Sequence, residues 1–297
     1  MKRVYYFLSA ALMGGLVACG GGGSKELACP DESVPYVVET TESVVPADTV
    51  DNFPEYTILE KTQVDLNVFP KDADGTIILF CGKSLYGWRG YNKDVVPARW
   101  TIDEAEGAIK ISGSGTGEGQ SDEGGDLIFA RKFKNFELSV DWKVSKGGNS
   151  GIFYLAQEIK DQPIFLSSPE SQILDNVNHP DAALGIAGNR QSSSLYDMIA
   201  AEPQNANPFG EWNTTKIMVY KGTVVHYQNG EKVLEYHLWT PKWKEMLQDS
   251  KFKPGGDFPV AFPLLNNCGG ENHEGYIGLQ DHGDDIWFKN IKIKILE

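Results

Sequence analysis

Short runs of alternating apolar and polar residues recur along the chain from about residue 56 onward. In the clearest run, Phe136 to Val144, five apolar residues alternate with four polar ones, which is the period of a half-buried β-strand. Isoleucine and lysine alternate in the same way over residues 291–295 at the C-terminus. A helical period is present only briefly, around residues 242–247. The pattern therefore predicts a chain built mainly of β-strands.

Turn signals separate these runs. The apolar runs 217–219 and 224–227 flank a Lys-Gly pair, and Asn229-Gly230 follows the second run, which is typical of a β-hairpin. Glycine makes up 32 of 297 residues, above the usual proportion of roughly 7%. Many short strands with glycine-rich turns and almost no helix predict an all-β fold, a jelly-roll β-sandwich, as one domain over residues 56–297.

The N-terminus has the pattern of a bacterial export signal. Lys2 and Arg3 precede a mostly apolar stretch, residues 4–17, that is shorter than the about 20 residues needed to span a bilayer. Leu16-Val17-Ala18-Cys19 resembles a lipobox, in which the cysteine is lipidated and becomes the first mature residue. We therefore predict a lipoprotein signal peptide over 1–18 and a lipid anchor on Cys19.

Residues 19–55 are rich in small, polar and acidic residues and have no sustained apolar period, which predicts a flexible tether. Gly20, rather than aspartate, follows the lipidated cysteine, so we expect anchoring to the outer membrane, in either leaflet. Loss of Lys2 and Arg3 would take the formal charge from −14 to −16. Such acidity excludes a nucleic-acid-binding role, which requires a basic surface.

Three cysteines, Cys29, Cys81 and Cys268, remain after the lipidated one. An odd number allows at most one disulfide, and their spacing does not identify the pair. No two of them lie in a CxxC-like spacing, so we expect no metal role for them.

Polar residues stand out on two otherwise strand-like segments. In residues 168–175 the alternation places Glu170 and Gln172 on one face and Ile173 on the other. In residues 276–282 it places Gln280 and His282 opposite an apolar face. One sheet of a sandwich turns a face away from the core, and we expect these side chains to gather there and bind sugar hydroxyls.

Seven short segments stand out in order over about 77–297: Leu79–Trp88, Asn135–Leu138, Gly147–Phe153, Gln172–Asp175 with His179-Pro180-Asp181, Leu195–Asp197, Gly210–Asn213, and Leu279–Gly283 with Phe288–Ile291. Together they resemble the 3-keto-disaccharide hydrolase domain family. The chain departs from the family pattern at Cys81, where Asn or Asp is usual, and by an insertion over about 259–272.

The resemblance implies a concanavalin A/laminin G-like jelly roll and an exported enzyme that acts on small oxidised glycosides, 3-keto-glycosides or 3-keto-disaccharides. A ketone at C3 acidifies the proton on C2, so a base can remove it and the aglycone can leave from C1. Such a reaction needs a tuned base, an oxyanion-stabilising group and an acid, but not the paired carboxylates of direct glycoside hydrolysis. A separate sugar oxidoreductase would have to make the ketone.

Within the resemblance, residue type suggests the roles. His179 and His282 are candidate bases, Glu170 is the acid or second base, Asp175 or Asp197 could orient a histidine, and Tyr196 could donate a proton. Arg89 could polarise an oxyanion. The predicted catalytic residues are thus Glu170, His179, His282, Asp175 and Tyr196, and the predicted substrate-binding residues are Trp88, Arg89, Asn149, Gln172, Asp197 and Gln280.

Alternatives remain beside this interpretation. The acidic residues Asp281, Asp284 and Asp285 could hold Ca²⁺, although no cofactor or metal is expected to be required. The same fold could serve as a non-catalytic carbohydrate-binding module. A laminarinase-type glycosidase fits least well, because Gln172 stands where a second carboxylate is needed. Structural roles are expected for His226 and Trp142, and a turn for residues 149–151.

Overall fold

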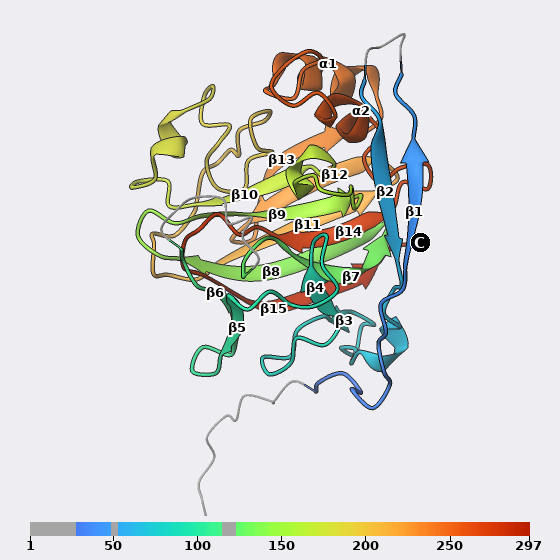
Figure 1. Ribbon diagram of the computed structural model, residues 1–297. Helices are drawn as coiled ribbons and strands as arrows, with labels where there is room; N and C mark the ends of the chain where they lie inside the picture. The colour runs from blue at the N-terminus through green and yellow to red at the C-terminus, as the bar shows by residue number, and fades with distance from the viewer. Residues whose placement is uncertain (1–27, 49–52, 115–122) are drawn as a thin grey trace, which may run out of the picture.

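The computed structural model describes residues 28–48, 53–114 and 123–297 (Figure 1). The predicted signal peptide and Cys19 lie outside the described residues. In the part of the chain that is described, no helix has both the length and the apolar character needed to cross a membrane.

Strands dominate the described chain, as the alternation predicts. The strands are β1 (Thr40–Val45), β2 (Tyr56–Lys61), β3 (Ile77–Ile78), β4 (Trp88–Gly90), β5 (Trp100–Asp103), β6 (Ala108–Ile111), β7 (Leu127–Phe133), β8 (Phe136–Val144), β9 (Asn149–Ala156), β10 (Glu170–Leu174), β11 (Asn213–Tyr220), β12 (Thr223–Gln228), β13 (Glu231–His237), β14 (Gly275–Leu279) and β15 (Ile286–Ile295). The helices are α1 (Pro241–Asp249) and α2 (Ala261–Asn266), with 3₁₀ turns η1 (Leu66–Val68), η2 (Ile164–Leu166) and η3 (Pro180–Ala183).

Two antiparallel sheets pack face to face (Figure 1). The larger has the order β13-β12-β11-β8-β15-β6-β5, with β3 also paired to β15, and the smaller has the order β10-β9-β14-β7-β4. Hairpin neighbours alternate with neighbours that are far apart in sequence, such as β8 with β15 and β9 with β14, which is the connectivity of a jelly roll. The predicted all-β jelly-roll sandwich is confirmed.

The core lies between the two sheets, and β8 shows how the sequence builds it. Along Phe136 to Val144 every apolar side chain is buried and every polar one between them is partly exposed. Trp142, expected to be a core residue, is fully buried, and its Nε1 donates to Thr215 Oγ1 at 2.9 Å. The period of two therefore locates both the strand and its buried face.

The segment before residue 55 is not wholly the tether that its composition predicts. β1 pairs with β2 antiparallel over six residue pairs, and the two strands lie side by side at the right of Figure 1. Cys29 forms a disulfide with Cys81, while Cys268 is a buried free thiol. The tether prediction is thus wrong for residues 40–45, because pairing with β2 supplies order that local composition does not reveal.

The brief helical period around 242–247 is confirmed as α1. Pro241 occupies the first turn, and the Thr240 side chain accepts from Trp243 N, so a cap and a preorganised φ begin the helix. Trp243 is buried and its Nε1 donates to Leu265 O at 3.0 Å, which joins α1 to α2. α2 lies within the insertion noted in the sequence.

His226 has the structural role expected of it. It is fully buried on β12, where Nδ1 donates to Ser193 O at 2.9 Å and Nε2 faces the Tyr154 hydroxyl at 2.8 Å. Burial lowers its pKa to about 4, against the smaller opposing effect of the Ser193 carbonyl. The folded chain therefore holds this imidazole neutral under conditions in which the unfolded chain protonates it.

We expect this histidine to make stability depend on pH. Because the unfolded state binds the proton more readily, stability is unaffected above pH 6.5 and falls as the pH drops from 6.5 towards 4. The loss reaches about 3 kcal/mol at pH 4. Urea unfolding of wild type, His226→Gln and the exposed control His237→Gln at pH 7 and 4.5 measures it. Equal pH slopes in wild type and His226→Gln would contradict the prediction.

Candidate active site

The five-stranded sheet has one face in the core and one turned away from it, and the predicted polar residues lie on the second. On β10 the Ile173 side chain belongs to the core cluster, so Glu170 and Gln172 point to the outer face. Just past β14, Gln280 follows the core residue Leu279 and also points outward. The two polar pairs read from the sequence therefore share one face, as predicted.

The strand between them completes this face. Asn149 begins β9 opposite Leu174, and Gly151 pairs with Gln172. The turn expected over residues 149–151 is therefore wrong, because the turn lies just before them and these residues pair with β10. As a result Asn149 joins the polar side chains of the outer face.

A small pocket forms where β9, β10 and the end of β14 meet. Its enclosed space is about 20 Å³, enough for a group the size of one water molecule. The lining residues are Asn149, Phe165, Glu170, Gln172, Tyr196, Lys251, Gln280 and His282. Four of the eight, Glu170, Gln172, Gln280 and His282, were predicted from the alternation of the strands, and Asn149 and Tyr196 were predicted within the resemblance.

Three amide side chains in this pocket have buried polar atoms without hydrogen-bond partners among the described residues. Asn149, Gln172 and Gln280 are 3%, 1% and 6% exposed, yet Asn149 Oδ1, both side-chain polar atoms of Gln172 and Gln280 Oε1 are unpartnered. A buried polar atom without a partner destabilises a fold by about 1–3 kcal/mol. Amides left in this state on one pocket wall are suited to a ligand rich in hydroxyl or carbonyl groups.

Glu170 is packed against the backbone of the neighbouring strand. It is 7% exposed, and a Cβ placed on Gly151 would come within 2.8 Å of its Cδ, closer than real Cβ atoms approach. The glycine therefore leaves the space in which the carboxylate sits.

Gly151→Ala is expected to displace the Glu170 carboxylate, and a reaction in which this carboxylate takes part should slow by about tenfold to a hundredfold, because a shift of about 1 Å at a reacting group can cost that much. Its backbone conformation is open to alanine, so folding should persist. Steady-state kinetics with circular dichroism checks this. Ser139→Ala is the control, because Ser139 is partly exposed on β8 and does not line the pocket. A kcat within twofold of wild type would contradict the prediction.

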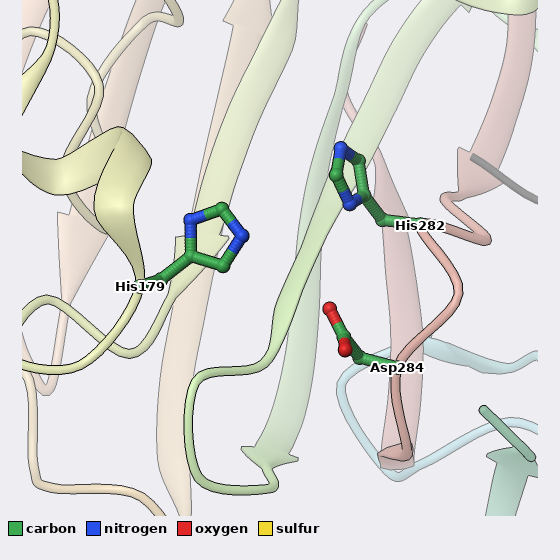
Figure 2. Close-up of side chains that lie close together, drawn as sticks. All are labelled: His179, His282 and Asp284. Carbon is green, nitrogen blue, oxygen red and sulfur yellow. The ribbon is translucent and has the colours of Figure 1, made fainter. Parts of the chain in front are cut away.

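The two predicted histidines lie together at the rim of the pocket. The rings of His179 and His282 are 6.0 Å apart and perpendicular, and Figure 2 shows them facing one another above Asp284. The Asp181 amide donates to His179 Nδ1 at 3.1 Å, so the proton of the neutral ring is on Nε2. Burial, and next the adjacent His282, lower the pKa of His179.

The acidic run that was a candidate Ca²⁺ site is divided among separate partners. The Asp281 carboxylate is buried against Arg99, Asp284 accepts from Asn149 N at 3.0 Å, and Asp285 accepts from Gly113 N. The three carboxylates do not converge on one point among the described residues. Instead, the ligand atoms of His179, His282 and Asp284 all lie within 4.8 Å of one another.

Lys251 lines the pocket and was missed in the sequence. Its Nζ lies 4.5 Å from the Tyr196 ring centre and 5.2 Å from that of Phe165, and its backbone N donates to Asp197 Oδ2 at 3.0 Å. Aromatic faces stabilise an ammonium group. No local pattern signals this residue, since it lies in the loop after α1, far along the chain from β9 and β10.

Tyr196 and Asp197 support the pocket by a different route from the one predicted. The Tyr196 hydroxyl donates to Asp181 Oδ2 at 2.9 Å, and burial, then Asp181, raise its pKa. Its proton is therefore engaged with Asp181 rather than directed into the pocket. Asp197 Oδ1 pairs with Arg190 at 2.7 Å, and Asp197 does not contact a histidine in this way. Its other carboxylate oxygen, Oδ2, accepts from Lys251 N and so holds the Lys251 backbone in place.

Asp175 also does not orient a histidine through its side chain. Its carboxylate accepts from Gly147 N, Val177 N and the Asn178 side chain. Burial acts to raise the pKa of Asp175, and these hydrogen bonds outweigh it and lower the pKa. Its main-chain O accepts from His179 N at 3.0 Å, so it stabilises the turn that carries His179.

Trp88 and Arg89 are wrong as substrate-binding predictions. Both belong to β4, at the opposite edge of the sheet from β10. Trp88 is 4% exposed in the core with its Nε1 bonded to Leu79 O, and Arg89 is 1% exposed and paired with Glu158 at 2.7 Å. They stabilise the fold, since breaking a buried ion pair leaves an uncompensated charge.

Comparison with known proteins identifies the family of the chain. Residues 75–294 match the 3-keto-alpha-glucoside-1,2-lyase-like domain family. The chain belongs to this family. It is also 56% identical, over the whole of both chains, to a 3-keto-disaccharide hydrolase of Bacteroides thetaiotaomicron. The predicted family is confirmed, as is the prediction of an enzyme that cleaves glycosidic bonds.

Solved structures support the fold of this family member. A Parabacteroides distasonis protein classed provisionally as a glycosyl hydrolase superposes with a TM-score of 0.62 at 30% identity, covering 76% of this chain and 95% of its own. A second such protein from the same organism has a TM-score of 0.50 at 22% identity, covering 90% and 94%. The second likeness concerns the fold alone.

A larger cavity of about 570 Å³ lies elsewhere, lined in part by Cys81, Lys83, Glu104 and Asn290. None of its lining residues belongs to the buried amides without partners, and none is a histidine. We therefore assign the site of this family member to the smaller pocket, where unpartnered amides, a carboxylate and an imidazole converge.

Proposed function

We propose that the chain cleaves glycosides already oxidised to a ketone at sugar C3, by removing the C2 proton and releasing the aglycone from C1. The observation that carries the proposal is the convergence of Glu170 and His282 with the buried, unpartnered amides of one pocket. The curated relative, a 3-keto-disaccharide hydrolase, supports the same substrate class.

The roles follow from position. Glu170 is the base, because its carboxylate lies in the pocket and is held against Gly151. Gln172, through its unpartnered Nε2, donates to the oxygen that becomes an enediolate, and the Lys251 ammonium adds positive charge on the same wall. His282, at the rim, passes a proton to the departing aglycone oxygen.

Bonds and protons balance in this scheme. The C2–H and C1–O bonds break, and a C1–C2 double bond forms. Glu170 takes the C2 proton, and His282 gives a different proton to the aglycone oxygen. Water then adds across the double bond, which regenerates the sugar hydroxyl and restores both protonation states. Elimination alone is a lyase reaction, and elimination followed by hydration gives net hydrolysis.

Substrate binding requires the pocket to widen. Its enclosed space of about 20 Å³ admits the reacting carbonyl but not a whole sugar ring. Phe165 and Lys251 belong to η2 and to the loop after α1 rather than to the sheet, so these are the walls that can separate. The rest of the sugar would lie over the rim beside His179.

The decisive experiment compares a 3-keto-glucoside with its unoxidised parent. We expect aglycone release from the ketone only, and in D₂O we expect deuterium at C2 of the hydrated product beyond the exchange seen without enzyme. Release from both substrates at similar rates would replace the proposal with direct hydrolysis. Tight binding of both with no release would favour the carbohydrate-binding module.

We further propose that the activity is exported and lipid-anchored through Cys19, at the outer membrane, and depends on a separate sugar oxidoreductase that supplies the ketone. The Cys29–Cys81 disulfide supports export, since such bonds persist in oxidising compartments. Metabolic labelling with a radioactive fatty acid tests the anchor. Label should enter wild type and be absent from Cys19→Ala.

A further inference from the structure

We propose that His179, His282 and Asp284 bind one divalent transition-metal ion at the rim of the pocket, with an open coordination position towards the substrate. The inference rests in part on the proposed function, because the pocket gives the ion its task. The site itself is argued from geometry, and it replaces the acidic run as the candidate metal site.

The three side chains come from two different segments and converge. His179 caps η3, while His282 and Asp284 follow β14, and Figure 2 shows all three directed into one gap. Their ligand atoms lie within 4.8 Å of one another, so shifts of side-chain size would bring each to about 2.0–2.2 Å from a common ion. All three are half-buried, so the cluster is partly accessible from solvent.

The ligand set selects the class of ion. Two imidazoles and one carboxylate suit Zn²⁺ or another divalent transition metal, whereas Ca²⁺ takes six to eight oxygen ligands. Three protein ligands with an open position are typical of catalytic rather than structural sites.

A second observation points to a ligand beside this cluster. Asp284 Oδ2 accepts from Asn149 N, and the buried Asn149 Oδ1 has no partner among the described residues. His282 lines the same pocket as the unpartnered Gln280 Oε1. An ion held here would therefore lie next to the amides that receive the substrate and could polarise its carbonyl oxygen. With the ion bound, His282 would be a ligand, so the proton for the departing aglycone would come from water on the ion rather than from this imidazole.

Binding must change one existing contact. His179 Nδ1 accepts from the Asp181 amide, so coordination through Nε2 requires the ring proton to move to Nδ1 and that hydrogen bond to break. Metal-bound histidines normally donate from their second nitrogen. We therefore expect weaker binding than at a structural zinc site, with a movement of the η3 turn.

The test measures metal binding without substrate. The untagged full-length protein is stripped with a chelator and titrated with Co²⁺, followed by visible absorption, and with Zn²⁺, followed by calorimetry. We expect one ion per chain, with affinity lowered by about a hundredfold or more in His179→Gln and in Asp284→Asn. His237→Gln, which changes an exposed histidine on β13, should bind as wild type does.

The outcomes separate this inference from the proposed function. Absence of stoichiometric binding by wild type, or binding unchanged in both folded variants, overturns the metal site even if 3-keto-glucosides are cleaved. Binding with no cleavage of any 3-keto-glucoside leaves the site standing and overturns the function. Full activity of the stripped protein, with no metal regained in the assay, overturns the ion's part in the reaction.

Discussion

Glu170→Gln is expected to lower kcat by about 10³-fold on a 3-keto-glucoside, with a much smaller effect on KM. Removal of a positioned general base typically costs 10²–10⁴-fold, and glutamine preserves the size of the side chain while it cannot accept the proton. Glu170 is nearly buried and packed against Gly151, so an outside base has little room to replace it. Steady-state kinetics measures the split between kcat and KM.

An isotope readout separates a base from a residue that only binds. Wild type should exchange the C2 proton of a 3-keto-glucoside with D₂O faster than the uncatalysed solution, and Glu170→Gln should lose this exchange. Glu137→Gln, on the partly exposed face of β8, is the matched control and should retain both activities. Enzyme-dependent exchange retained at the wild-type rate in Glu170→Gln would assign the base elsewhere.

The sequence predicts the parts of this site that lie on regular strands. A period of two fixes which side chains share a face, so Glu170 with Gln172 and, separately, Gln280 could be assigned to an outer face before any pairing was known. The same rule located β8 and its buried residues. It could not show that β9 lies between β10 and β14, because strand order depends on long-range contacts.

The site predictions that were wrong or missing have the same origin, because they too depend on long-range contacts. Trp88 and Arg89 have residue types suited to sugar binding, but β4 pairs with β7 at the far edge of the sheet, where both side chains are buried. Lys251 enters the pocket from a loop whose local pattern is unremarkable. Asp284 is one of three nearby carboxylates, and only the approach of His179 from η3 distinguishes it.

The N-terminal segment shows the limit of composition most clearly. Residues 28–48 bury few side chains, yet Asp31 N donates to Val68 O, the Tyr36 hydroxyl donates to Thr62 O, and β1 pairs with β2. Order here is supplied by partners elsewhere in the chain. The Cys29–Cys81 bond is the covalent part of that attachment, and three cysteines without coordinates could not identify it.

Replacing both Cys29 and Cys81 by serine is expected to lower the free energy of unfolding by about 4 kcal/mol. The bond joins residues 52 apart, and closing a loop of that length removes about this much conformational free energy from the unfolded chain. Urea unfolding with and without reductant measures it: reductant should shift the wild-type midpoint to that of the double variant and should not move the variant. Cys268 is a buried free thiol, and in the double variant it has no other cysteine among the described residues with which to form a disulfide. A wild-type midpoint unchanged by complete reduction would mean that the hydrogen bonds of the N-terminal segment, rather than the disulfide, hold it to the sandwich.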